Sequence, residues 1–205
     1  MYKYISNDLL LNPTQTLILI DWDDTLFPSS WIVYNKINLH SESDKIKYLS
    51  YFQLLDLQIY KTLKKLSDYG TIIIITNALL SWIFQCLELL PKTKVLLEKI
   101  KVVSAREKYQ DTSTVIYWKI NTFIDEIKNY PKANNIISFG DADYEYKALI
   151  NLFNDKFIPH KYLKSVKFIK SNNFNLTLEQ LINIRKFIKD IYKRQRHIDM
   201  VFEKL

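Results

Sequence analysis

Three aspartates and a threonine follow directly after a short apolar segment near the start of the chain. Leu17-Ile18-Leu19-Ile20 runs without a break into Asp21-Trp22-Asp23-Asp24-Thr25. Ionised carboxylates this close together repel one another, and a cation placed among them removes that cost. Carboxylate oxygens are hard ligands that suit Mg²⁺. The alternative is an acidic turn after a strand, in which Asp24 or Thr25 caps the next element.

Four further apolar segments have the length and composition of buried strands. Leu17–Asp21 is itself an apolar run expected to be a strand buried on both faces. The clearest of the four others is Thr71-Ile72-Ile73-Ile74-Ile75, which ends in Thr76-Asn77. The other three are expected at Lys101–Ser104, Asn135–Phe139 and Val166–Lys170.

The segments between these strands carry the periodicity of amphipathic helices. One long helix is expected from Ser43 to Asp68, ended by Gly70 in the position of a C-terminal cap. The last helix is expected to begin with a capping box formed by Thr177 and Gln180. Shorter helices are expected at Ala78–Leu90, then to Lys99, and at Tyr117–Asn129 and Tyr144–Phe153. Loops are expected at 26–31, with exposed aromatic residues, and at 106–114.

Strands that alternate with helices predict an α/β fold: a three-layer, doubly wound parallel sheet of about five strands. The chain has 205 residues, which is enough for one domain with a proper core. We therefore expect a single domain over 1–205, without a large cap domain. It would consist of a lead-in at 1–15, a flap loop and helix at 26–70, and a C-terminal helix within 171–205.

The overall composition is that of an ordinary soluble protein. Hydrophobic residues make up 48% and charged residues 25% of the chain. Apolar runs are too short for a membrane span, and the first residues lack the features of a secretory signal. The single cysteine, Cys86, lies in an apolar stretch and is expected to be a buried thiol, which fits an intracellular, cytoplasmic protein. The net charge of +7 favours anionic partners in general.

Polar side chains follow three of the predicted strands at the points where those strands end. Asp21, Asp23 and Asp24 follow the first strand, Thr76 follows the second, and Asp141, Asp143 and Glu145 follow the fourth. In a parallel sheet these ends lie along one edge, where such folds bind their ligands. The sequence therefore predicts that three segments far apart in the chain form one polar site.

These motifs resemble those of the haloacid dehalogenase (HAD)-like superfamily, in its phosphatase-type branch. Asp21-Trp22-Asp23-Asp24-Thr25 matches the family's Asp-x-Asp-x-Thr after a strand, and Thr76 matches its strand ending in Thr or Ser. Gly140-Asp141-Ala142-Asp143-Tyr144-Glu145 matches its acidic motif, with Glu145 in place of the usual final Asp. The resemblance spans roughly 17–170 and implies a HAD-like Rossmannoid fold.

The resemblance also implies a role for each residue of the site. Asp21 would be the nucleophile that forms an aspartyl-phosphate, and Asp23 the general acid and base. Mg²⁺ would be bound by the Asp21 carboxylate, the Asp23 backbone carbonyl and Asp141. Thr76 would donate a hydrogen bond to a phosphate oxygen, and Thr25 and Glu145 would support these groups.

The family also has a lysine near the start of a helix, for which this chain offers two candidates. Lys119 is in the first turn of the helix that precedes the fourth strand, and Lys108 follows the third strand. The lysine would screen the nucleophile and bind phosphate as a point charge; Lys119 is the preferred assignment.

Three other residues near the motifs keep two interpretations each. Asp24 is expected to be a hydrogen-bonded structural acid rather than a ligand. Asp143 could belong to the metal site or cap a loop, and Asn77 could contact substrate or form a turn. His40, His160 and His197 do not adjoin the motifs, and no catalytic role is expected for them.

The substrate is less well defined than the chemistry. The short spans after Thr25 and after Leu79 predict a nearly capless protein, and an open site suits a large phosphorylated substrate such as a phosphoprotein or a nucleic-acid end. A phosphorylated small molecule is the other candidate substrate class. A partner subunit could also serve as a lid. Basic residues crowd the last helix and are interpreted either as a phosphate-binding surface or as a solvated helix face: Arg185, Lys186, Lys189, Lys193, Arg194 and Arg196.

Two other functions are compatible with the same motifs. The chain could be a non-enzymatic HAD-fold binding module for protein or nucleic acid. It could also be a phosphotransferase whose acceptor is not water. A Mg²⁺-dependent phosphatase accounts for more of the residues, because a binding role has no need of Asp23.

Overall fold

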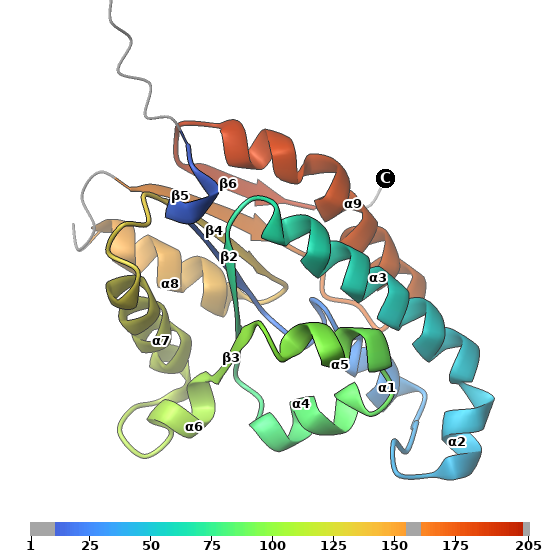
Figure 1. The fold of residues 1–205 in the computed structure, drawn as a ribbon. Coiled ribbons are helices and arrows are strands. Elements are labelled where there is room, and N and C mark those ends of the chain that lie inside the picture. The colour runs from blue at the N-terminus through green and yellow to red at the C-terminus, as the bar shows by residue number, and fades with distance from the viewer. Residues whose placement is uncertain (1–10, 155–160, 203–205) are drawn as a thin grey trace, which may run out of the picture.

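A computed structural model describes residues 11–154 and 161–202, and within them the chain forms an α/β structure around a six-stranded parallel sheet (Figure 1). The strand order is β3-β2-β1-β4-β5-β6, and every neighbouring pair is parallel. The strands are β1 (Thr16–Ile20), β2 (Thr71–Thr76), β3 (Lys101–Ser104), β4 (Asn135–Gly140), β5 (Tyr162–Lys167) and β6 (Ile198–Val201).

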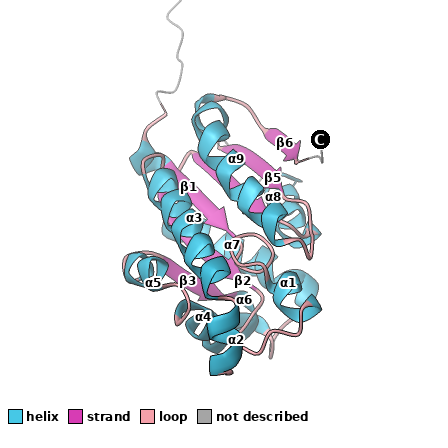
Figure 2. Cartoon of the chain, turned by 90° about the vertical axis from the view of Figure 1, so that its right-hand side faces the viewer, coloured by secondary structure: helices cyan, strands magenta, loops and turns pink. Residues whose placement is uncertain are grey.

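Helices cover both faces of this sheet, so that the molecule has three layers (Figure 2). Successive strand residues point to opposite faces, and their neighbours in the core alternate accordingly. Ile18 and Ile20 of β1 pack into one apolar cluster, whereas Leu17 and Leu19 pack into the other. This burial on both sides explains why the central strands are continuous apolar runs.

The larger apolar cluster lies under the helices that follow β1, β2 and β5. These are α1 (Ser29–Tyr34), α3 (Leu49–Ser67), α4 (Leu80–Leu87), α5 (Pro91–Leu97) and α9 (Phe174–Lys193). The smaller cluster lies under α6 (Ala105–Tyr109), α7 (Val115–Asn129) and α8 (Asp143–Asn154). Figure 1 shows the two groups on opposite sides of the sheet, with α3 beside α9 and α7 beside α8.

The strand order changes direction at β1. The chain runs outward from β1 to β2 and β3, and then crosses back so that β4 pairs with the other side of β1. The connections that leave the carboxyl ends of β1 and β4 therefore diverge, and a crevice opens where they part. Asp21 follows β1 and Asp141 follows β4, so the fold brings both acids to this crevice.

The prediction of about five strands is wrong by one. The sixth strand, β6, follows α9 and pairs with β5 at the edge of the sheet, in a segment expected to be helical. β6 is only four residues long and buries Ile198, which is too short a pattern to distinguish from the end of a helix. β5 also begins four residues earlier than predicted, at Tyr162 rather than Val166. Residues 1–10 of the predicted lead-in and 203–205 of the predicted C-terminal helix lie outside the described residues.

Three helical predictions also need correction. The long helix expected over 43–68 is divided at Tyr48 into α2 (Glu42–Lys47) and α3, because Tyr48 leaves the helical conformation at φ −103° and ψ 12°. The segments expected as loops at 26–31 and 106–114 overlap α1 and α6. The aromatic residues expected to be exposed are buried, since Phe27 is 0% and Trp31 is 7% exposed. Propensity did not reveal these short helices because tertiary packing stabilises them.

The predicted capping box at the start of the last helix is not formed. Asn173 caps α9, and its Oδ1 accepts hydrogen bonds from the backbone N–H groups of Asn175 and Leu176. Thr177 is buried inside the helix, and the Gln180 side chain pairs with both the N–H and the carbonyl of Ile169. Gln180 therefore fixes the connection after β5 rather than the helix terminus.

A buried lysine holds the other end of α9. Lys164 of β5 is 0% exposed, and its Nζ donates to the carbonyl oxygens of Ile191 and Tyr192 in the last turn. A cation there complements the helix dipole. Burial, with a smaller effect from Arg194, lowers the pKa of Lys164 to about 8.

A buried aspartate fixes α5 against α3. Asp56 is 3% exposed, and its carboxylate accepts hydrogen bonds from the backbone N–H groups of Lys92 (2.9 Å) and Thr93 (2.8 Å) in the first turn of α5. We expect Asp56→Ala to lower the free energy of unfolding by about 2 kcal/mol, because two buried donors lose a charged acceptor. Urea denaturation measures the change. Asp68→Ala, which removes an exposed acid from the end of α3, should be indistinguishable from the unaltered protein, and a similar loss in both variants would contradict this account.

Two other features bear on the sequence predictions. Cys86 of α4 is fully buried, as predicted. Among the described residues, no helix combines the length and the apolar character that crossing a membrane requires.

Candidate active site

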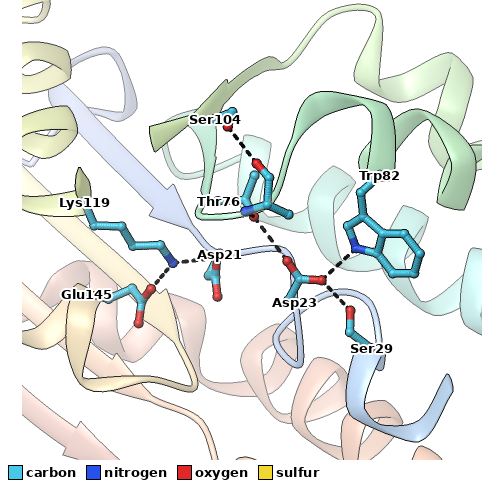
Figure 3. A network of polar contacts seen from close by, with 9 residues as sticks. Asp21, Asp23, Ser29, Thr76, Trp82, Ser104, Lys119 and Glu145 are labelled. Carbon is cyan, nitrogen blue, oxygen red and sulfur yellow. Dashed lines mark hydrogen bonds and ion pairs between the residues drawn. The ribbon is translucent and has the colours of Figure 1, made fainter. Parts of the chain in front are cut away.

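Asp21 belongs to a buried ion-pair cluster centred on Lys119 (Figure 3). Its carboxylate follows β1, and its Oδ1 is 2.6 Å from Nζ of Lys119 in the first turns of α7. The same Nζ also contacts Oε1 of Glu145 in α8. Lys119 is 2%, Glu145 3% and Asp21 5% exposed, so all three charges are removed from bulk water. One lysine therefore bridges two carboxylates supplied by different elements.

Burial and neighbouring charges determine the protonation of this cluster. Burial raises the pKa of Asp21 well above its ordinary value; Lys119 opposes this shift, and Glu145 and Asp141 add to it. Burial alone would lower the pKa of Lys119, but the attraction of Asp21 and Glu145 outweighs it and raises the pKa. Lys119 therefore stays protonated, and the excess of negative charge falls on the carboxylates.

Asp141 follows β4 and adds a third carboxylate to the same region. It is 7% exposed, and burial together with the charges of Glu145 and Asp24 raises its pKa to about 6. Position 140, directly before Asp141, requires glycine because the Glu145 side chain packs against it: a Cβ there would lie 2.4 Å from that side chain. The glycine at the start of the acidic motif Gly140–Glu145 thus allows Glu145 to reach Lys119.

Asp23 is held by three side-chain donors from different elements (Figure 3). Trp82 Nε1 donates to Oδ1 at 2.8 Å, and Ser29 Oγ donates to the same oxygen. Thr76 Oγ1 donates to Oδ2 at 3.2 Å and accepts from the backbone N–H of Ala78 at 2.9 Å. In this structure the Thr76 hydroxyl therefore contacts Asp23, and it would have to rotate to donate to a phosphate as predicted.

A tight loop after β1 presents Asp23 and buries its neighbours. The Trp22 carbonyl accepts from the N–H groups of Leu26 and Phe27, both at 2.9 Å. Asp24 takes the left-handed conformation, with φ 54°, that closes the loop. Its carboxylate accepts from the backbone N–H and the hydroxyl of Ser30 in the first turn of α1. This agrees with the interpretation of Asp24 as a structural acid.

The structure separates the remaining candidates from the cluster. Lys108 pairs with Asp125 at 2.6 Å on the surface, so the geometry favours Lys119 as the lysine of the site. Asp143 pairs with Lys167, and its side chain is 61% exposed. His40 contacts Gln85 and His197 contacts the N–H of Leu163, whereas His160 lies outside the described residues.

The two predicted supporting residues Thr25 and Asn77 are near the motifs, but their contacts do not define a role. The Thr25 hydroxyl and the Asn77 carbonyl oxygen are buried without a hydrogen-bond partner among the described residues. Their participation stays a prediction.

The residues of the cluster fit a divalent cation in charge and ligand type. The buried carboxylates of Asp21 and Glu145 pair with the buried Lys119. The buried carboxylate of Asp141 interacts electrostatically with the charges of Glu145 and Lys119. Glu145 Oε2 is buried without a partner among the described residues. Within the same residues, no set of three or more His, Cys, Asp and Glu side chains forms a metal site. The predicted ligand set needs only two such side chains, those of Asp21 and Asp141, because its third ligand is the backbone carbonyl of Asp23.

Two residues of this site were not anticipated from the sequence. Ser29 and Trp82 lie outside the recognisable motifs, and only the structure shows that both reach Asp23. A weak signal for Trp82 exists in the sequence, because it lies in the first turn of α4, the helix that follows Thr76. Helix position alone, however, does not tell which side chain turns toward the crevice.

The six basic residues lie in the second half of α9 and just after it, where the chain returns to the amino ends of the strands to begin β6. Asp21 follows the carboxyl end of β1, at the opposite edge of the sheet. Arg185 donates to the Gln58 carbonyl (3.1 Å) and to Thr62 Oγ1 (2.8 Å), and so joins α9 to α3. Lys186, Lys189, Lys193, Arg194 and Arg196 are exposed. This placement favours a solvated face over a surface that guides phosphate to the site.

The raised pKa of Asp141 predicts a pH-dependent stability in the absence of metal. The folded state keeps the Asp141 proton up to about pH 6, whereas the unfolded state releases it near pH 3.8, so deprotonation destabilises the fold as pH rises between these values. Relative to the unaltered protein, Asp141→Asn should therefore gain about 3 kcal/mol in free energy of unfolding between pH 4 and pH 7. Urea denaturation across this range in a chelator measures the difference. A difference that does not change with pH would contradict the prediction.

Comparisons of the chain with protein-family models, with curated proteins and with solved structures gave no match. The fold and the geometry of the site therefore carry the functional argument.

Proposed function

We propose that this protein is a Mg²⁺-dependent phosphohydrolase that transfers a phosphoryl group from a phosphomonoester to Asp21 and then to water. The observation that carries the proposal is the presence of two carboxylates after β1, each held in place by a different set of side chains. Asp21 is buried against Lys119, and Asp23 is held nearby by Thr76, Ser29 and Trp82. The resemblance of the motifs to the HAD-like superfamily supports the same chemistry.

The first step forms a bond between the Asp21 carboxylate and phosphorus. Lys119 contacts Oδ1 of Asp21, and Oδ2 has no partner among the described residues. In our proposal Oδ2 attacks while the bond from phosphorus to the leaving oxygen breaks. Asp23 gives its proton to that oxygen, so the leaving group departs as an alcohol. The product on the enzyme is an aspartyl-phosphate.

The second step reverses the role of Asp23. Its carboxylate removes a proton from a water molecule, whose oxygen attacks phosphorus and displaces the Asp21 carboxylate. Inorganic phosphate leaves, and Asp23 again holds a proton. Lys119 and a donor such as Thr76 stabilise the charge on the phosphoryl oxygens during both displacements.

Asp21, Asp141 and the backbone carbonyl of Asp23 would hold the metal. When bound, Mg²⁺ offsets the charge of the carboxylates and of the phosphate. This neutralisation allows Asp21 to be ionised, as a nucleophile must be, despite the burial that raises its pKa.

The described elements leave the site with little cover. Between β1 and α3 the chain contributes only the short helices α1 and α2, and between β2 and β3 only α4 and α5. We propose that the phosphorylated substrate is therefore free to be large, such as a phosphoprotein or a nucleic-acid end. A protein that only binds a partner would not need the three hydrogen-bond donors that orient Asp23. A phosphotransferase would use the same residues with an acceptor alcohol in place of water.

Hydrolysis of phenyl phosphate during a titration with Mg²⁺ tests the proposal. Turnover should require Mg²⁺ and should fall at least about 100-fold in Asp141→Asn, because the metal ligand is lost. The matched control is Asp143→Asn, which changes the exposed acid two residues later and should retain turnover. Turnover that is independent of metal, or equal in the two variants, would contradict the proposal.

A further inference from the structure

The hydrogen bonds to Asp23 distinguish its two carboxylate oxygens. Oδ1 accepts from both Ser29 Oγ and Trp82 Nε1, whereas Oδ2 accepts only from Thr76 Oγ1 (Figure 3). An indole has a single N–H and no acceptor, so Trp82 can only donate. An oxygen that already receives two donors is poorly placed to carry a proton for transfer. Oδ2 is the better placed oxygen, since its one donor is the hydroxyl predicted to turn to phosphate.

The packing of Trp82 fixes the direction of its N–H. Its ring packs edge-on against Phe27, with ring centroids 5.9 Å apart, and Phe27 in turn stacks on Trp22 at 5.9 Å. Trp22 and Phe27 are both 0% exposed, so this aromatic group is part of the core. Aromatic side chains have few rotatable bonds, and a ring fixed in this way holds its polar atom in place.

The start of α4 is fixed by neighbours as well. Glu107 of α6 accepts from the backbone N–H of Leu80 at 2.7 Å, and Ser104 Oγ donates to the carbonyl of Ala78 at 2.7 Å. These contacts tie the end of β2 to the end of β3, directly before Trp82. The donor to Asp23 is therefore preorganised by side chains from two separate segments, the loop after β1 and the junction of β3 with α6.

We propose that Trp82 is a positioning residue for acid catalysis by Asp23. Its indole N–H holds Oδ1, together with Ser29, and so turns Oδ2 toward the leaving oxygen of the substrate. This inference rests on the proposed function, because it assigns to Oδ2 the proton that is transferred when the bond to phosphorus breaks. The same oxygen then takes the proton of the attacking water.

The leaving-group dependence of kcat/KM tests this role. Trp82→Phe keeps an aromatic ring and removes only the donor. With phenyl phosphate, whose leaving group needs a proton, kcat/KM should fall about 30-fold, a share of the 10²–10⁴ that acid–base catalysis supplies. With 2,4-dinitrophenyl phosphate, whose leaving group departs as an anion, it should fall less than about threefold. A merely structural role would lower kcat/KM for both substrates equally.

The matched control is Trp118→Phe. Trp118 lies in α7, and its Nε1 donates to the carbonyl of Ser113 at 3.0 Å, away from Asp23. This variant loses an equivalent indole hydrogen bond and should leave the dependence on the leaving group unchanged. A steeper dependence of kcat/KM on the leaving group in both variants would overturn the assignment of Trp82.

An NMR measurement reports the contact without turnover. The Trp82 indole signal is assigned in a ¹⁵N spectrum by its absence in Trp82→Phe. Asp23→Asn should shift this signal and leave that of Trp118 in place, because the Trp82 indole donates to Asp23 and the Trp118 indole donates to Ser113. An unshifted Trp82 signal would overturn the inference. If Trp82→Phe turned over both substrates with the same leaving-group dependence as the unaltered protein, the role of Trp82 would be overturned and the proposed function would stand. If the unaltered protein showed no turnover, both the role of Trp82 and the proposed function would be overturned.

Discussion

Replacing Asp21 by Asn is expected to lower kcat for phenyl phosphate by at least about 10⁴-fold, because losses of this order follow removal of a catalytic nucleophile. Asparagine keeps the shape of the side chain and an acceptor for Lys119, but it cannot displace the leaving group. The measurement is initial rates at saturating Mg²⁺, with the amount of folded protein verified by circular dichroism.

The same substitution should not destabilise the metal-free protein. Asp21 is buried beside Glu145 and Asp141, and this environment raises its pKa, so a neutral side chain is at least as well tolerated as the carboxylate. Loss of activity would then appear together with equal or greater resistance to urea. Asp24→Asn is the neighbouring control, since Asp24 contacts Ser30 rather than Lys119, and it should keep kcat within about tenfold. Activity of Asp21→Asn within tenfold of the unaltered protein would exclude Asp21 as the nucleophile.

Replacing Lys119 by Met is expected to affect both stability and turnover. Lys119 is the cation shared by Asp21 and Glu145, and all three are buried. Removing one partner from a buried ion pair costs about 3–5 kcal/mol, because the remaining charges lose their compensation. Turnover should fall by about 10³-fold, since the lysine also stabilises the phosphoryl oxygens. Urea denaturation and initial rates measure the two effects.

A second variant separates these two effects. Lys119→Met combined with Glu145→Gln removes one of the stranded charges and should recover part of the lost stability, but none of the turnover. Lys108→Met tests the competing assignment; this lysine pairs with Asp125 at the surface, and its loss should change neither quantity appreciably. If Lys108→Met abolished turnover and Lys119→Met did not, the assignment of the lysine would be reversed.

The sequence was most informative where the chain is buried. Ile72–Ile75 and Asn135–Phe139 have no polar face, so their burial on both sides of a parallel sheet could be predicted from composition. The order of strands and helices then predicts that Asp21, Thr76 and Asp141 lie at one edge of the sheet. The same reasoning missed β6 and predicted α2 and α3 as one continuous helix, because short elements and breaks depend on packing more than on local propensity.

The sequence also predicts some residues of the candidate site and not others. Its acids and Lys119 could be identified because each falls next to a strand end or a helix start. Ser29 and Trp82 could not, since their contact with Asp23 depends on the loop after β1 and on the orientation of α4. Asp24 illustrates the intermediate case: its type suits a metal, but the left-handed loop turns it toward Ser30.

The measurement that tests the central claim most directly is the trapping of phosphate on Asp21. Asp23→Asn cannot activate water, but it should still react with 2,4-dinitrophenyl phosphate, which needs no proton donor. After acid quenching, mass spectrometry of peptic fragments should show one added phosphoryl group on the fragment that contains Asp21, only when Mg²⁺ is present. The modification should disappear in the double variant Asp21→Asn, Asp23→Asn. A phosphoryl group on another residue, or none in the presence of Mg²⁺, would contradict an aspartyl-phosphate at this site.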